Sequence, residues 1–165
     1  MTHPSIEPFR TIILQPHWMQ FVINELPMLL LCVVGFIAGG MENMPLSNIC
    51  LIVSALIALR LLYSFVDLRR IEFRINDEQL IMEHGVFTRK CDYMELYRII
   101  DFNEHRSIMQ QICGLKSVVI YSGDRNTPKL DVIGVKNELD LVSIIRERVE
   151  YNKQRKGVYE ITNRL

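Results

Sequence analysis

The fold is decided by the stretch LPMLLLCVVGFIAGGM (residues 26–41), followed after a short polar break by LSNICLIVSALIALRLLYSFV (residues 46–66). A membrane core of about 30 Å needs roughly 20 mostly apolar residues in a helix. The second run meets this length with one charge, Arg60, and the first run meets it if its helix begins near Phe21. The break holds the turn-forming residues Gly39, Gly40, Asn43 and Pro45. The two runs therefore predict an antiparallel helical hairpin over residues 21–66 that spans a membrane.

Two alternatives also fit a pair of apolar helices. One is a hairpin buried in a soluble core, but the remainder of the 165-residue chain is too small to cover both helices. The other is a cleaved signal peptide in the first run. That run lacks basic residues close to the start of the chain, and a second apolar run follows it at once. The membrane hairpin remains the favoured interpretation.

The residues that flank the hairpin predict its orientation. Arg69 and Arg70 follow the second run, whereas the short link carries only Glu42. Positive charge concentrates on the cytoplasmic side of membrane proteins. We therefore expect a multi-pass membrane protein with both termini in the cytoplasm. Trp18 and Phe21 fall at the headgroup level, where aromatic rings act as interfacial anchors.

Two ionisable side chains, Glu25 and Arg60, lie in or near the predicted spans. With a rise of about 1.5 Å per residue and a turn near residue 43 or 44, they fall within about one helical turn of each other. Charges at this depth are usually paired or reach toward the headgroups. Three interpretations stay open: an ion pair between the helices, two independent side chains that reach the headgroups, or an Arg60 that binds a lipid phosphate or a partner helix.

From residue 67 onward the pattern is that of a small, mostly antiparallel β domain. Apolar and polar residues alternate over 71–75, 79–83, 86–96 and 99–104, which predicts half-buried strands. Residues 107–113 predict one or two helical turns, and 118–121 and 130–135 two further strands. Asn137 is a good N-cap for a final helix whose apolar stripe is Leu141, Val142, Ile145 and Val149. We expect a lead-in over 1–20, the hairpin over 21–66, a domain over 67–151, and a loosely ordered tail over 152–165.

Composition and motifs argue against several classes of function. The formal charge is zero, which disfavours binding to nucleic acid through phosphate attraction. The four cysteines show neither disulfide nor metal spacing, which fits a reducing compartment. His84 and His105 each follow a glutamate in a predicted strand, so each Glu–His pair points to opposite faces. We therefore predict no enzyme, no cofactor and no metal.

The order of elements resembles the bacterial pleckstrin-homology-like "membrane-flanked" domain family. The matching features are Gly85-Val86-Phe87 before a basic strand, Tyr97-Arg98-Ile99, the segment 107–113, Gly114-Leu115, and a strand that ends at Ser122-Gly123-Asp124. The resemblance implies a PH-like, strongly bent antiparallel sheet or barrel of seven strands, closed at one end by the C-terminal helix. Because the family is bacterial, it also implies that the membrane is the inner membrane. The pattern of residues supports six strands, and the seventh would come from 86–96 or 125–130. The resemblance implies little about activity, because a fold does not determine function.

Two functions are compatible with these observations. The first is a non-catalytic protein-interaction or scaffold subunit of a membrane complex, with other proteins or a second copy as partners. Anchoring already supplies localisation, and confinement to a membrane favours even weak protein contacts. The second is recognition of a phospholipid headgroup by the PH-like domain. The residues predicted to face the membrane surface or a partner are Arg69, Arg70, Arg89, Lys90 and Arg98.

Overall fold

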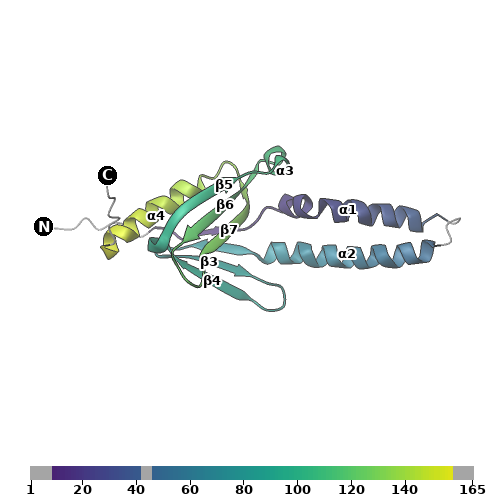
Figure 1. Ribbon diagram of the computed structural model, residues 1–165, viewed down its shortest axis with the longest axis horizontal. Helices are drawn as coiled ribbons and strands as arrows, with labels where there is room; N and C mark the ends of the chain where they lie inside the picture. Colours follow the sequence, from purple (N-terminus) through teal and green to yellow (C-terminus); the bar gives the residue numbers. More distant parts are fainter. Residues whose placement is uncertain (1–8, 42–45, 158–165) are drawn as a thin grey trace.

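A helical hairpin projects from one end of a β-rich domain (Figure 1). The structure is a computed structural model that describes residues 9–41 and 46–157. Helices α1 (Met19–Gly39) and α2 (Ser47–Arg70) lie side by side and are long and apolar enough to cross a membrane. Most of their side chains are exposed, so the chain's own domain does not cover them. The predicted turn over 42–45 lies outside the described residues.

The domain consists of two antiparallel sheets and one long helix. The first sheet has the order β1 (Ile12–Leu14), β2 (Glu72–Ile75), β3 (Gln79–His84) and β4 (Lys90–Glu95). The second has the order β5 (Ile99–His105), β6 (Leu115–Ser122) and β7 (Lys129–Lys136). The 3₁₀ turn η1 (Leu96–Arg98) separates β4 from β5, so the described strands form two sheets where the resemblance implied one bent sheet.

The seventh strand comes from the lead-in. The sequence placed it within 86–96 or 125–130, whereas the structure has it at β1, which precedes the hairpin. β1 pairs with β2 so that Leu14 lies opposite Phe73. The hairpin is therefore inserted between the first two strands of the sheet. A strand of three residues is too short to show a periodicity, and prolines lie on both sides of it in the sequence. Its partner β2 lies about 60 residues later in the chain, so the local sequence did not predict this strand.

The core lies between the sheets and the C-terminal helix α4 (Leu141–Lys156). Alternate residues of the strands point inward, among them Phe73, Ile75 and Leu80, which are almost fully buried. The predicted stripe of α4 supplies Leu141, Ile145 and Val149 to the same cluster. The sheets and α4 thus share one hydrophobic core.

Helix α4 differs from its predicted bounds at both ends. Its N-cap is Asp140 rather than Asn137, because the Asp140 carboxylate accepts hydrogen bonds from the Ser143 backbone N–H (3.2 Å) and hydroxyl (2.7 Å). The helix also continues to Lys156, beyond the boundary expected at residue 151. Residues 158–165 of the expected tail lie outside the described residues.

A buried arginine joins α4 to the first sheet. Arg148, which is 3% exposed, donates to the carbonyl oxygens of Ile75 (2.6 Å) and Arg10 (2.7 Å).

The two long helices pack closely through small residues. A Cβ added at Gly35 would lie 2.1 Å from the Ser54 hydroxyl, and one added at Gly39 would lie 2.6 Å from Leu51 Cγ. Ser54 is 1% exposed and donates to the Cys50 carbonyl oxygen at 2.7 Å. Small residues four apart let apolar helices approach in this way. Gly35 and Gly39 show this four-residue spacing in the sequence, but the close packing of the helices was not predicted from it.

A polar network fixes the start of α1 on the second sheet. Gln110, in the short helix α3 (Ile108–Ile112), donates to Gln20 Oε1 (3.0 Å) and to the Ser117 hydroxyl (2.8 Å). The His17 N–H donates to the Gly134 carbonyl oxygen at 2.9 Å. All three side chains of the Gln20–Gln110–Ser117 network are buried. These bonds hold α3 beside the first turn of α1, as Figure 1 shows.

Candidate functional site

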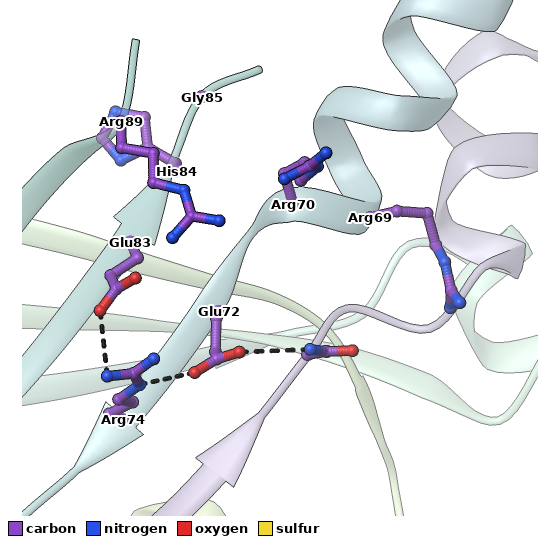
Figure 2. A pocket seen from close by; sticks show the side chains of 9 residues that line it. Arg69, Arg70, Glu72, Arg74, Glu83, His84, Gly85 and Arg89 are labelled. Atoms are coloured by element: carbon purple, nitrogen blue, oxygen red, sulfur yellow. Dashed lines mark hydrogen bonds and ion pairs between the residues drawn. The ribbon is translucent and has the colours of Figure 1, made fainter. Parts of the chain in front are cut away.

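A polar cavity of about 270 Å³ lies where the end of α2 meets the first sheet (Figure 2). Its size is at the lower end of that of ligand pockets, which suits a small polar group. The cavity brings together residues from the lead-in, the last turn of α2, β2, β3 and the β3–β4 loop. They are Gln15, Arg69, Arg70, Glu72, Arg74, Glu83, His84, Gly85 and Arg89.

Local geometry explains how the cations reach this place. Arg69 and Arg70 form the last turn of α2, where cations are favoured by the helix dipole. Gly85 ends β3 with φ +106°, and a Cβ there would lie 2.1 Å from the Thr88 carbonyl oxygen. Glycine therefore permits the tight loop that returns Arg89 to the cavity. This loop also explains why β4 begins at Lys90 rather than at residue 86.

Both carboxylates of the cavity already pair with one arginine. Glu72 and Glu83 lie directly opposite each other on β2 and β3, and like charges so placed repel. Arg74 bridges them, with Nε 2.5 Å from Glu72 Oε1 and Nη1 3.2 Å from Glu83 Oε1. The hydrogen bond from Arg74 holds the pKa of Glu72 below its usual value. Figure 2 shows the contacts of Arg74 with both glutamates. The Gln15 side-chain amide also donates to Glu72 Oε2 at 3.3 Å.

The other three arginines of the cavity remain available. Within the described residues, no hydrogen bond or ion pair holds Arg69, Arg70 or Arg89, and all three are exposed. The lining has four arginines and two glutamates, so positive charge is in excess. Guanidinium groups bind phosphate and carboxylate oxygens with paired hydrogen bonds. The arrangement is therefore suited to an anion.

A metal centre does not fit the same place. Three unpaired guanidinium groups repel a cation, and Arg74 occupies both carboxylates. Over 9–41 and 46–157, no group of three or more His, Cys, Asp and Glu residues is placed to hold a metal ion.

An apolar groove of about 590 Å³ lies next to the cavity, between α2 and the β3–β4 loop. Phe87, at the tip of the loop, is 89% exposed and stacks on Tyr63 of α2 with 6.1 Å between ring centroids. The groove is lined by Leu56, Leu59, Arg60, Leu62, Tyr63, Val66, Val86 and Phe87. Phe87 was expected within a strand over 86–96 and carried part of the family resemblance, whereas it lies in the β3–β4 loop, and its contact with α2 was not predicted.

Glu25 and Arg60 form an ion pair between the two long helices. The Ser64 hydroxyl also donates to Glu25 Oε1 at 2.8 Å. The sequence left three interpretations of these two residues open, and the structure has the first of them, an ion pair between the helices. The Arg60 side chain is still 54% exposed and lines the groove, whereas Glu25 is mostly covered.

The remaining predicted site residues lie apart from the cavity. Lys90 is exposed on β4 opposite His84 and does not line the cavity. Arg98 lies in η1, where it contacts the Tyr97 hydroxyl (2.9 Å) and the Asp124 carboxylate (3.3 Å). Trp18 is 51% exposed at the start of α1. Phe21 instead packs edge-on against Phe65, with 5.3 Å between ring centroids.

Further apolar side chains surround the base of the hairpin. In α3, Ile108 and Ile112 are 74% and 75% exposed, and α3 contacts α1. Together with Trp18 and Phe87 they place exposed apolar groups on both sides of the hairpin at the end of the domain that carries it. Exposed apolar groups at this level are compatible with contact with a bilayer or a protein.

Three polar residues of β2 and β3 that line the cavity were not predicted from the sequence. Glu72, Arg74 and Glu83 read as ordinary polar positions of alternating strands. The one local signal was Gly85-Val86-Phe87, a glycine followed by two apolar residues between two strands. An apolar tip on a loop is a feature that sequence can flag, but the contact it makes is set by the fold.

Comparison with known proteins gives one match. A family model described as "Bacterial PH domain" matches residues 26–149, which is most of the chain. No curated protein and no solved structure matches it. The matched range begins near the start of the first apolar run and ends in α4.

Proposed function

Because this chain belongs to the bacterial PH domain family, we propose that it is a membrane-anchored, non-catalytic module that binds the headgroup of an anionic phospholipid. The binding site is the cavity at the end of α2. In this proposal α1 and α2 cross the bacterial inner membrane, and the domain lies against its cytoplasmic face. Arg69 and Arg70, at the end of α2, are then at the level of the lipid phosphates.

The observation that carries the proposal is a group of three arginines that, within residues 9–41 and 46–157, take part in no hydrogen bond or ion pair. Arg69 and Arg70 of α2 and Arg89 of the β3–β4 loop line one cavity, while Arg74 pairs with both carboxylates there. Exposed cations near a bilayer gain about 1 kcal/mol each from anionic lipid. A phosphate held in the cavity would gain charge-assisted hydrogen bonds from these guanidinium groups in addition to that general attraction.

The surroundings of the cavity support a bilayer at this level. Trp18, Phe87, Ile108 and Ile112 all expose apolar surface around the base of the hairpin. Aromatic and aliphatic groups in this position gain free energy when the headgroup region covers them. The same groups would cost free energy if water surrounded them.

The chemistry of the cavity supports a binding role over a catalytic one. None of the nine residues that line it in the described part of the chain is a serine, threonine or cysteine, so His84 has no side-chain nucleophile there to activate. Its glutamates are held by Arg74, which lowers the pKa of Glu72 and opposes a role for it as a general base at neutral pH.

A protein-interaction role is the second candidate, and the edge of the second sheet favours it. Among the described strands β5 pairs only with β6. Ile100 on β5 is 70% exposed. An open edge of this kind accepts an added strand from a partner. Such a partner would bind on η1 and β5, away from the arginine cavity.

The cavity is tested with the full chain in nanodiscs that contain both zwitterionic lipid and phosphatidylglycerol. Native mass spectrometry of the protein released from these discs counts the phosphatidylglycerol molecules that remain bound. Arg89→Gln removes one of the three available guanidinium groups, and we expect about a tenfold drop in retained phosphatidylglycerol, since a charge-assisted hydrogen bond contributes about 1.5 kcal/mol or more. Arg70→Gln should act in the same direction.

Lys90→Gln is the matched control, because it removes the same charge from the next residue, which does not line the cavity. We expect less than a twofold change for it. Equal losses for Arg89→Gln and Lys90→Gln would mean that only general surface charge attracts the lipid, and the proposal would then be wrong.

A further inference from the structure

The polar cavity and the apolar groove adjoin each other along the same two elements. On the β3–β4 loop, Gly85 and Arg89 line the cavity, whereas Val86 and Phe87 line the groove. On α2, the last residues line the cavity and the preceding turns line the groove. A ligand with a polar end and an apolar end can therefore contact both without a break.

We propose that cavity and groove form one site for a single, intact anionic glycerophospholipid. The phosphate lies among Arg69, Arg70 and Arg89, and an acyl chain runs along α2 beneath Phe87. This inference rests on the proposed headgroup function and adds that the chain of the same lipid is bound. It also requires that the tip of the β3–β4 loop enters the apolar layer of the membrane.

The depth of the groove agrees with that requirement. Tyr63 precedes Arg70 by seven residues, which is about 10 Å along a helix axis. Phe87 stacks on Tyr63. The tip of the β3–β4 loop therefore lies about 10 Å from Arg70 along the axis of α2, in the direction of the apolar part of the helix. A phospholipid has the same order of groups, with the phosphate at the surface and the chains below it. The distance places Phe87 below the phosphate level, beside the upper part of the chains.

The chemistry of the groove selects an acyl chain rather than a polar ligand. Seven of its eight lining residues are apolar or aromatic, and the exception, Arg60, is paired with Glu25. Its wall is the outer face of α2, where Leu59 is 65% exposed and Leu62 is 60% exposed. The occupant of a groove on this face of a membrane helix is the lipid that surrounds the helix. The adjoining arginines determine which lipid is retained there.

The test compares two lipids that share a headgroup and differ in chain length. The probes are dihexanoyl and dioleoyl phosphatidylglycerol, added to the full chain in a neutral detergent and measured by native mass spectrometry. Phe87→Ala and Leu59→Ala each remove part of the groove. We expect about a fivefold loss of affinity for the long-chain lipid and less than a twofold change for the short-chain lipid.

Ile52→Ala is the matched control on α2. Ile52 is 62% exposed, close to the 65% of Leu59, but it does not line the groove. We expect no selective loss of the long-chain lipid for this variant. Phe87 is so exposed that its replacement leaves the core intact, and a melting temperature equal to that of the wild type verifies the fold.

The outcomes separate the two proposals. If Arg89→Gln weakens both lipids while Phe87→Ala and Leu59→Ala behave like Ile52→Ala, the headgroup site stands and the acyl groove is wrong. If Arg89→Gln weakens neither lipid, the headgroup function fails and the inference fails with it. An equal loss of affinity for the short-chain and the long-chain lipid in Phe87→Ala would also contradict acyl-chain binding in the groove, because Phe87 would then act on the headgroup.

Discussion

At the scale of single residues, a buried lysine depends on one carboxylate. The Lys116 side chain is 5% exposed, and its Nζ lies 2.9 Å from Glu104 Oε2. Arg106 also donates to Glu104, and the hydrogen bonds from Arg106 and Lys116 lower the pKa of Glu104. A buried charge without a partner carries a desolvation cost that nothing offsets. Glu104 therefore stabilises the fold by keeping Lys116 paired.

Replacing Glu104 tests this pair. We expect Glu104→Gln to lower the free energy of unfolding by about 1–2 kcal/mol at pH 7, because a neutral amide pairs less well with a buried ammonium. Thermal unfolding of the full chain in detergent measures the loss. Asp131→Asn is the control: Asp131 pairs with Lys129 on the surface, with both side chains 49% exposed, and such pairs contribute little.

The same pair has a predictable pH dependence. The folded pKa of Glu104 is below its ordinary value of 4.5, so its contribution to stability is complete above about pH 4.5 and is lost as the pH falls through the folded pKa. The stability difference between wild type and Glu104→Gln should therefore shrink below about pH 4.5. A difference that stays constant from pH 7 to pH 3.5 would contradict this account.

At the scale of elements, the contact between α1 and α2 depends on glycines. Gly35 faces the buried Ser54, and a Cβ at this position would lie 2.1 Å from the Ser54 hydroxyl. That hydroxyl is held by its hydrogen bond to the Cys50 carbonyl oxygen, so it cannot move without losing the bond. The helices would have to separate to accept a side chain at Gly35.

We expect Gly35→Ala to destabilise the hairpin by about 1–2 kcal/mol, since overpacking exceeds the gain in helix propensity. Gly40→Ala is the control, because the nearest atom to its added Cβ is 3.5 Å away. Unfolding followed by circular dichroism in detergent compares the two variants. Equal melting temperatures would show that the helices do not pack as closely as the structure has them.

At the scale of the whole molecule, the domain is assembled from both sides of the hairpin. β1 precedes the hairpin and completes the first sheet, and Arg148 of α4 donates to the Arg10 carbonyl oxygen next to β1. Ile12 and Leu14 pack against the core. Residues 68–165 by themselves therefore lack one strand of their own fold.

Two shortened variants test this organisation. In one, residues 19–69 are replaced by a short Gly-Ser linker, which can join β1 to β2 because Leu14 and Phe73 are cross-strand neighbours. In the other, the chain begins at residue 68. We expect the second to be less stable by about 2–4 kcal/mol, or roughly 10–20 °C in melting temperature for a domain of this size. If the two melt together, β1 is not part of the domain.

The sequence by itself determined the features that are set by local pattern. The hairpin helices, most strands and the stripe of α4 follow from runs and periodicities within about twenty residues. Arg69 and Arg70 were identified because charge at the end of an apolar run is visible locally. Three site features were decided by the tertiary structure: β1 beside β2, Arg89 beside the end of α2, and Phe87 on Tyr63. Each is a contact between segments that are separated in the sequence by the hairpin or by the β2–β3 strand pair. Such contacts depend on how the elements pack in three dimensions, and a local periodicity carries no information about that packing.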